Sequence, residues 1–182
     1  GLAGVMKNKQ YEKRMSDLEQ IDYSGMILFS GESEPLLHKR LHTLISKTKF
    51  QLPSSRIEVN TNGDLLSLDK LKRLFDAGLD TLSVSLYDGA DQIDKFEAMR
   101  DQAGLSPEQV ILRRRYLQDG NYGINMTNRG GLVETEPFQR SKPEPGLGVD
   151  NGQKFPLQQV CYYPFYMLTV DVGGNTTICS HD

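Results

Sequence analysis

The sequence predicts an α/β fold with parallel strands, arranged either as a barrel or as a doubly wound sheet. Short apolar runs alternate with longer segments in which apolar residues recur at helical spacing. Four predicted strands begin about 25 to 30 residues apart, the length of a strand, a helix and the crossover between them. Turn-forming residues such as Pro53 to Ser55 separate these elements.

The first half of the pattern holds two helix-strand pairs. Residues 9–21 are the first predicted helix, and the apolar run 26–29 is the strand after it. The second helix has its apolar face in residues 37–45, and residues 56–60 alternate like a half-buried strand.

Two further pairs follow at the same spacing. Ser67 is the expected N-cap of a helix over residues 68–75, and strand 81–86 comes next. A helix over residues 90–103 then precedes strand 109–116.

Residues 121–155 break this rhythm, because they are rich in Gly, Pro and Asn and show no sustained period. We expect a short strand near residues 124–127 and a linker after it. Residues 166–171 and 175–179 flank the turn sequence Val172-Gly173-Gly174, which predicts a β-hairpin that opens a second, smaller module.

Charge and hydropathy exclude several functions. The 21 Lys and Arg residues are interspersed with 24 Asp and Glu residues, for a net charge of −3, so no basic surface for nucleic acid is expected. No apolar run approaches the roughly 20 residues that span a bilayer. We therefore expect a cytoplasmic protein with a small-molecule or peptide partner and neither a nucleic-acid nor a membrane partner.

Three strand ends carry groups able to bind a ligand, which in parallel α/β folds lies at the carboxyl ends of the strands. Gly31 to Pro35 place two carboxylates on a small-residue turn, and Asn60 to Gly63 offer amides and a hydroxyl. In strand 81–86, Ser83 and Ser85 lie on the face opposite the leucines and valine. The alternatives are a solvated turn, an asparagine turn with Gly in a left-handed conformation, and small polar filling of a barrel.

Taken in order, these three loops resemble the radical S-adenosylmethionine (SAM) family. That family ends its second strand with Gly-Gly-Glu-Pro or Gly-x-Gly-Glu-Pro, its third with Thr-Asn-Gly, and carries Ser-Leu-Asp-Gly on its fourth. Here the corresponding segments are Gly31 to Pro35, Thr61 to Gly63 and Ser85 to Gly89.

The resemblance implies roles for these residues. Glu34 and the backbone around it would receive the amino group of SAM, while Asn62 and Ser85 would lie near its ribose and methionine. The sequence departs from the family pattern where Ser33 replaces Gly and where Tyr87 is inserted before the Asp. The residues expected at the SAM site are Gly31, Glu32, Ser33, Glu34, Pro35, Asn60, Asn62, Ser83, Ser85, Arg113 and Arg115.

The arginines at residues 113–115 end the last predicted strand, and one of them is expected to pair with the SAM carboxylate through two parallel hydrogen bonds. Alternation does not select one, because Val110 and Ile111 make both faces begin apolar. Surface arginines paired with helix acids are the alternative.

The two cysteines of the chain, Cys161 and Cys179, extend the resemblance. Cys161, Gly174 and Cys179 have the spacing that opens the SPASM/twitch type of auxiliary domain, and the hairpin between the cysteines would bring two thiolates to one 4Fe-4S cluster. A disulfide or two buried thiols is the alternative.

The resemblance implies a partial (β/α)6 TIM-like barrel in residues 1–135, a linker in 136–158 and the start of the auxiliary domain in 159–182. The family's Cys-x3-Cys-x2-Cys motif, which binds the catalytic 4Fe-4S cluster, is absent from the sequence. We therefore expect a piece of a longer enzyme, inactive alone, with the ligands of that cluster upstream.

The implied function is reductive cleavage of SAM to a 5′-deoxyadenosyl radical, which abstracts hydrogen from a peptide, protein or sugar-like substrate. An electron donor such as flavodoxin or ferredoxin is implied as a partner, and no catalytic side chain is predicted. The alternative is an iron-free barrel that binds a peptide or small ligand without redox chemistry. An aldolase-like barrel ranks below both, because the strand ends lack a Lys for a Schiff base.

Overall fold

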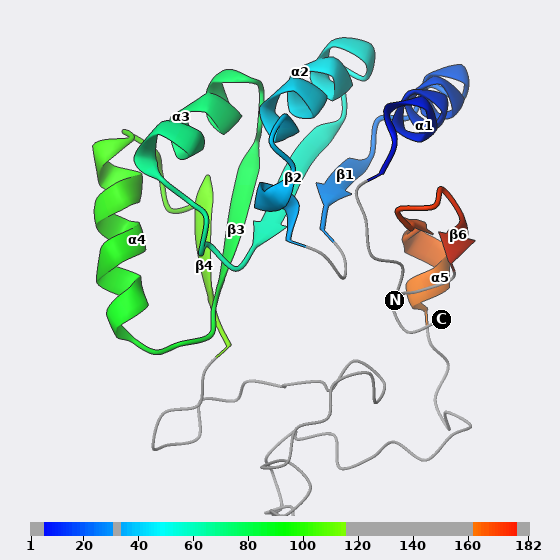
Figure 1. The fold of residues 1–182 in the computed structure, drawn as a ribbon. Helices are drawn as coiled ribbons and strands as arrows, with labels where there is room; N and C mark the ends of the chain where they lie inside the picture. Colours follow the sequence, from blue (N-terminus) through cyan, green and yellow to red (C-terminus); the bar gives the residue numbers. More distant parts are fainter. Residues whose placement is uncertain (1–5, 31–33, 116–161, 178–182) are drawn as a thin grey trace, which may run out of the picture. The chain divides into compact units, whose positions relative to one another are not determined.

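The computed structural model describes residues 6–30, 34–115 and 162–177 (Figure 1). The chain divides into two units, one holding a four-stranded sheet and the other a small hairpin. Among the described residues, no helix is long and apolar enough to cross a membrane.

The first unit begins with α1 (Asn8–Gln20), β1 (Met26–Phe29), the 3-10 turn η1 (Pro35–Leu37), α2 (Leu41–Gln51) and β2 (Arg56–Thr61). It continues with α3 (Leu68–Asp76), β3 (Thr81–Leu86), α4 (Asp91–Gln102) and β4 (Val110–Arg114). The strands pair in the order β1-β2-β3-β4 and every pair is parallel. This confirms the predicted α/β fold with a parallel sheet, and the described strands show no reversal of order.

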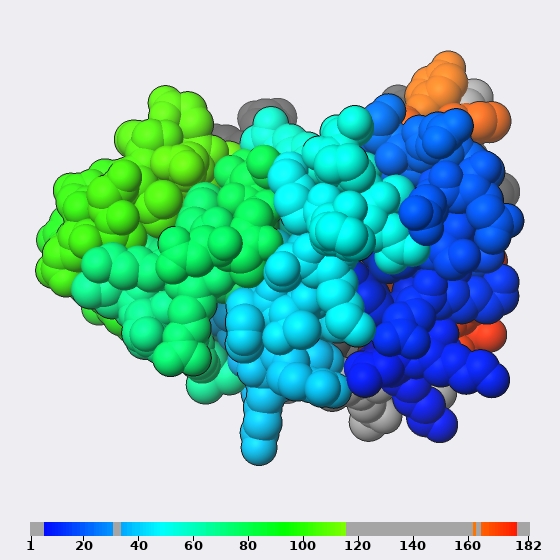
Figure 2. All heavy atoms as spheres, turned by 90° about the horizontal axis from the view of Figure 1, so that it is seen from above, coloured from blue at the N-terminus to red at the C-terminus, as the bar shows by residue number. Residues whose placement is uncertain are grey.

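One face of the sheet is apolar and packs under helices. Ile57 and Val59 of β2 and Leu82 and Val84 of β3 are fully buried, since alternation turns them all to that side. The helices contribute buried residues of their own to the same core, among them Ile45, Leu71 and Phe96. Figure 2 shows α1 to α4 side by side in chain order, and neighbouring helices contact each other.

A second apolar cluster joins α1 to α2. Tyr11 and Met15 are buried against Leu52. The Tyr11 hydroxyl lies 2.9 Å from the carbonyl oxygen of Leu44, to which it donates, and 2.7 Å from Thr48 Oγ1. Burial raises the pKa of Tyr11 above its ordinary value, although the hydrogen bond with Thr48 opposes this shift.

The structure confirms the predicted helices and strands of this unit with two corrections. The helix expected from residue 37 begins at Leu41, because Glu34 caps the separate turn η1 by accepting a hydrogen bond from Leu36 N. The last strand ends at Arg114 instead of residue 116. Ser67 is the N-cap of α3 as expected, since its side chain accepts from Lys70 N at 3.3 Å.

The second unit contains α5 (Tyr163–Tyr166), which the sequence did not predict, and the expected hairpin. The hairpin pairs β5 (Thr169–Val170) with β6 (Thr176–Thr177) antiparallel, in shorter strands than predicted. The strand expected near residues 124–127, the linker and the proposed domain boundaries lie outside the described residues.

Candidate functional site

On β2 to β4, the face of the sheet opposite the helices carries polar side chains beside Ile111, whereas on β1 the same face carries Met26 and Leu28. We call the part formed by β2 to β4 the polar face. Its polar residues are Glu58 and Asn60 from β2, Ser83 and Ser85 from β3, and Arg113 from β4. Alternation along each strand and the register between strands place them on the same side. The interior of a closed α/β barrel is usually filled by branched apolar side chains. A polar face of this kind is therefore built for polar contacts, and the serine alternation predicted for β3 is confirmed.

Glu34 connects the loop after β1 to the end of β2. Its Oε1 accepts from Leu36 N at 2.9 Å and from Thr61 Oγ1 at 2.5 Å, while its Oε2 accepts from Asn62 N at 2.9 Å. Both carboxylate oxygens are therefore engaged by protein donors. In this structure the side chain of Glu34 acts as a brace between two strand-end loops.

Asn62 and Gly63 form the turn at the end of β2. Asn62 Nδ2 donates to Asp64 Oδ2 at 2.8 Å, and Asp64 N donates to Asn62 Oδ1 at 3.0 Å. Gly63 has φ +81°, and a Cβ there would lie 2.6 Å from Cζ of Phe96. The asparagine-turn alternative is thus present in the structure, and it fixes the backbone at the strand end.

Asn60 of β2 is in register with Ser83 of β3 and forms a hydrogen bond with Ser85, two residues further along that strand. Ser85 Oγ donates to Asn60 Oδ1 at 3.4 Å, and Ser85 is 4% exposed. Within the described part of the chain, the amide nitrogen of Asn60 has no hydrogen-bond acceptor. The pair therefore presents a free donor on the polar face.

Arg113, Ser83 and Glu58 form a chain of contacts across three strands. Arg113 Nε donates to Ser83 Oγ at 3.2 Å, and Ser83 Oγ donates to Glu58 Oε1 at 3.0 Å. Arg113 Nη2 lies 3.6 Å from the same Glu58 oxygen. The hydroxyl of Ser83 is therefore already used inside the protein.

Sequence reasoning missed Glu58. Alternation along residues 56–60 places it on the same face as Asn60, and that pattern alone would have drawn attention to it. Pairing between β3 and β4 also distinguishes Arg113 from the other two arginines, because Arg113 is in register with Ser85 and contacts Ser83. Arg115 follows β4 directly and donates its backbone N–H to Leu86 O at 2.7 Å.

Several predicted residues lie outside the described residues, namely Gly31, Glu32, Ser33, Cys161 and Cys179. Pro35 is described and begins η1. Among the described residues, no three His, Cys, Asp or Glu side chains lie close enough together to hold a metal ion.

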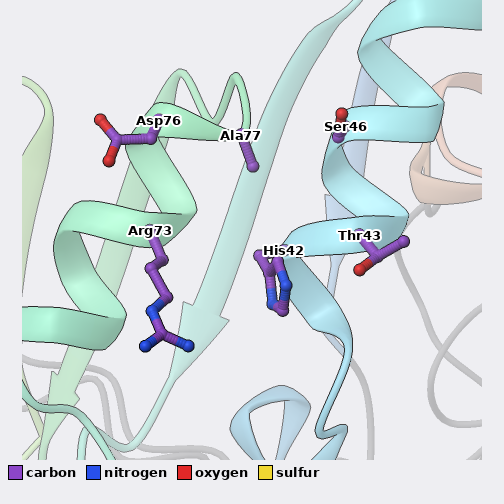
Figure 3. A pocket seen from close by; sticks show the side chains of 6 residues that line it. All are labelled: His42, Thr43, Ser46, Arg73, Asp76 and Ala77. Carbon is purple, nitrogen blue, oxygen red and sulfur yellow. The ribbon is translucent and has the colours of Figure 1, made fainter.

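A hollow of about 380 Å³ lies between α2 and α3, lined by His42, Thr43, Ser46, Arg73, Asp76 and Ala77 (Figure 3). It is a shallow surface feature on the helices, and none of the predicted site residues lines it. The polar face has the stronger chemistry, because its charged and hydroxyl groups are held by hydrogen bonds to one another. We therefore take the polar face and its strand ends as the candidate site.

Comparison with known proteins gives one named activity. S-adenosyl-L-methionine-dependent 2-deoxy-scyllo-inosamine dehydrogenase from Niallia circulans is 31% identical over 180 residues, covering 98% of this chain and 63% of that protein. The crystal structure of BtrN in complex with AdoMet and 2-DOIA is 27% identical with a TM-score of 0.72, covering 98% of this chain and 62% of that one. The open conformation of BtrN, 23% identical with a TM-score of 0.61, covers 97% of this chain and shows the shared fold.

These matches correct the family assignment made from the motifs. The motifs indicated radical SAM enzymes with a SPASM/twitch-type auxiliary domain in general, but no family model matches the chain. The relatives that match include a SAM-dependent dehydrogenase and the crystal structure of BtrN with AdoMet. The broad assignment is therefore wrong as stated, and a narrower likeness to this dehydrogenase replaces it. The chain spans about 63% of the length of that relative.

Proposed function

We propose that the whole protein is a SAM-dependent dehydrogenase that oxidises one hydroxyl of a small, sugar-like ring. The observation that carries this proposal is the similarity of nearly the whole chain to a SAM-dependent dehydrogenase of 2-deoxy-scyllo-inosamine. The polar sheet face supports it, because polar groups held in place by hydrogen bonds suit a ligand rich in hydroxyls.

We propose further that the four parallel strands belong to a partial (β/α)6 barrel. Their order follows the chain without reversal, and one face packs under α2, α3 and α4. In such a barrel the opposite, polar face turns inward, and the strand ends that carry Asn62, Ser85 and Arg115 lie at the mouth.

The donors at these strand ends fit SAM, which carries ribose hydroxyls, an amino group and a carboxylate. Asn60 and Ser85 offer an amide and a hydroxyl at neighbouring strands. We assign the SAM carboxylate to Arg115, since the charge of Arg113 is already offset by Glu58 whereas no ion pair involves Arg115 in the described part of the chain. Glu34 holds the loops that receive the amino group.

Asn60, Ser85 and Arg115 would hold SAM, which, reduced by one electron from a 4Fe-4S cluster and split with loss of methionine, would supply the chemistry that removes a hydrogen atom from the hydroxyl-bearing carbon of the substrate. Completing the oxidation to a ketone requires loss of the hydroxyl proton to a base and of one electron to an acceptor. The chain's own residues bind and orient both ligands. We place the ligands of the reducing cluster outside this chain.

Cys161 and Cys179 are our candidates for ligands of a second cluster, which would accept that electron. In the sequence, Cys161 precedes α5 and Cys179 follows β6. We propose a barrel in residues 1–135, a linker in 136–158 and a second module in 159–182. A flavodoxin or ferredoxin as electron donor and a cytoplasmic location belong to the same proposal.

Binding of SAM to the full-length protein, prepared without oxygen and reconstituted with iron and sulfide, tests this function. We expect Arg115→Gln to raise the Kd for SAM about tenfold, because it removes a charge-assisted pair with the carboxylate. Arg114→Gln, the neighbouring substitution, is the matched control and should leave the Kd unchanged. With reductant and 2-deoxy-scyllo-inosamine, the wild type should form 5′-deoxyadenosine and the corresponding ketone.

Two results would count against the proposal. A folded, reconstituted protein that binds no SAM would remove the cofactor assignment. A protein that binds SAM and a ring ligand but never cleaves SAM would instead support the non-catalytic binding barrel.

A further inference from the structure

Glu58 is a mostly buried carboxylate with one oxygen uncommitted. Its side chain is 13% exposed and lies on the polar face of β2. Oε1 accepts from Ser83 and lies near Arg113, whereas Oε2 has no donor within the described residues. A carboxylate oxygen has room for further hydrogen bonds, so Oε2 is an acceptor for a ligand.

Arg113 is held at one edge and free at the other. Ser83 takes the Nε–H, and the ion pair with Glu58 engages Nη2. The side chain is 46% exposed, and Nη1 has no acceptor among the residues that the structure describes. The guanidinium therefore keeps donors available beside the Glu58 acceptor.

The charges of this pair decide which ligand suits it. Because Glu58 lies 3.6 Å from Arg113, the positive charge of the guanidinium is largely offset and a ligand carboxylate would also meet the negative charge of Glu58. A hydroxyl has both a donor and acceptors, so neighbouring hydroxyls can donate to Glu58 and accept from Arg113.

We propose that Glu58 and Arg113, fixed by Ser83, form a subsite for the neighbouring hydroxyl groups of a polyhydroxylated ring. In this proposal Glu58 and Arg113 hold the substrate, and the proposal rests on the dehydrogenase function proposed above. Ser83 is a positioning residue, because it is 0% exposed and its hydroxyl accepts a hydrogen bond from Arg113 and donates one to Glu58. SAM is assigned to other residues, Ser85 and Arg115, and Ser85 is in register with Arg113 on the neighbouring strand.

Calorimetric titration of the full-length, reconstituted protein with two probes, 2-deoxy-scyllo-inosamine and neutral scyllo-inositol, tests the subsite. We expect Glu58→Gln and Arg113→Gln each to raise the Kd for both probes at least about tenfold. The Kd for SAM should change less than about twofold, since SAM binding is assigned to other residues. Arg114→Gln and Glu12→Gln, which alter an adjacent arginine and a surface glutamate paired with Lys47, should change neither.

The outcomes separate this inference from the function it rests on. Tight binding of both probes by folded Glu58→Gln and Arg113→Gln would overturn the subsite, and so would equal losses for the probes and for SAM. A wild type that binds SAM but neither probe would overturn the subsite while leaving the cofactor assignment intact. A wild type that binds the probes through Glu58 and Arg113 but not SAM would support the subsite and contradict the dehydrogenase. Arg113→Gln keeps the test open if Glu58→Gln fails to fold, because Arg113 is half-exposed.

Discussion

The two faces of the four-stranded sheet come from the same strands and differ in almost every physical property. On β3, Leu82 and Val84 pack under helices while Ser83 and Ser85 turn to the other side. Side chains on the apolar face make apolar contacts with the helices. Side chains on the polar face form hydrogen bonds with side chains of the neighbouring strands. The apolar face supplies stability, and in our proposal the polar face supplies the groups that bind ligands.

Leu82→Ala should have the largest effect on stability. Leu82 is 0% exposed, so its truncation leaves a cavity and should lower the free energy of unfolding by about 2 to 5 kcal/mol. Ser83→Ala, one residue away on the polar face, should cost only about 1 kcal/mol. Urea unfolding of both variants measures the contrast, and similar losses for the two would contradict the division between the faces.

Gly63→Ala should rank next. The alanine would have to keep the positive φ of Gly63. Its Cβ would lie 2.6 Å from Phe96 Cζ and 2.9 Å from Val84 Cγ1. Backbone strain and overpacking together predict a loss of about 2 to 4 kcal/mol in the free energy of unfolding. Gly104→Ala is the control, because Gly104 also has a positive φ but a Cβ there meets nothing within 4 Å. Equal losses at both positions would show that packing against Phe96 does not matter.

Glu34→Gln tests the brace between the strand-end loops. The glutamine side chain has only one acceptor oxygen, so its NH2 group would face either Asn62 N or Leu36 N, each of which now donates to the carboxylate at 2.9 Å. We expect the free energy of unfolding to fall by about 1 to 3 kcal/mol and the amide of Asn62 or of Leu36 to exchange its hydrogen faster. Thr61→Ser keeps the hydroxyl that contacts Glu34 and should leave exchange at Asn62 unchanged. Unaltered protection of both amides in Glu34→Gln would show that the contacts of Glu34 with the two loops are dispensable.

Tyr11→Phe should have the smallest effect, away from both faces. It removes hydrogen bonds to Leu44 and Thr48, for a loss of about 1 kcal/mol in the free energy of unfolding at neutral pH. Because burial raises the pKa of Tyr11 in the folded state, the folded state favours the neutral phenol. Its contribution is thus complete below the unfolded pKa of about 10 and is lost as the pH rises through the folded pKa. Unfolding measured across that range should show a shallower decline for Tyr11→Phe than for the wild type.

Local patterns predicted most of the sheet, because alternation and helical spacing are properties of short segments. The two sides of β3 followed directly from Leu82 and Ser83, and the same reasoning extended to Glu58 would have completed the polar face. The choice among the three arginines could not be made this way. It depends on pairing between β3 and β4, which sets Arg113 beside Ser85.

The role of Glu34 was also beyond the sequence. Its contacts with Thr61 and Asn62 span 27 and 28 residues and exist only once β1 and β2 are paired. The capping of η1 by the same side chain displaced the start of the next helix to Leu41, since the turn uses the residues expected to begin it. Both departures come from one carboxylate that serves local and distant donors together.

The most direct test of the account follows deuterium in the full-length, reconstituted protein. The substrate is 2-deoxy-scyllo-inosamine with deuterium on its hydroxyl-bearing carbons, supplied with SAM and a reductant. We expect mass spectrometry to find one deuterium in the 5′-deoxyadenosine released and a ketone in the ring. A folded protein that binds SAM and releases 5′-deoxyadenosine without deuterium, or no 5′-deoxyadenosine at all, would contradict it.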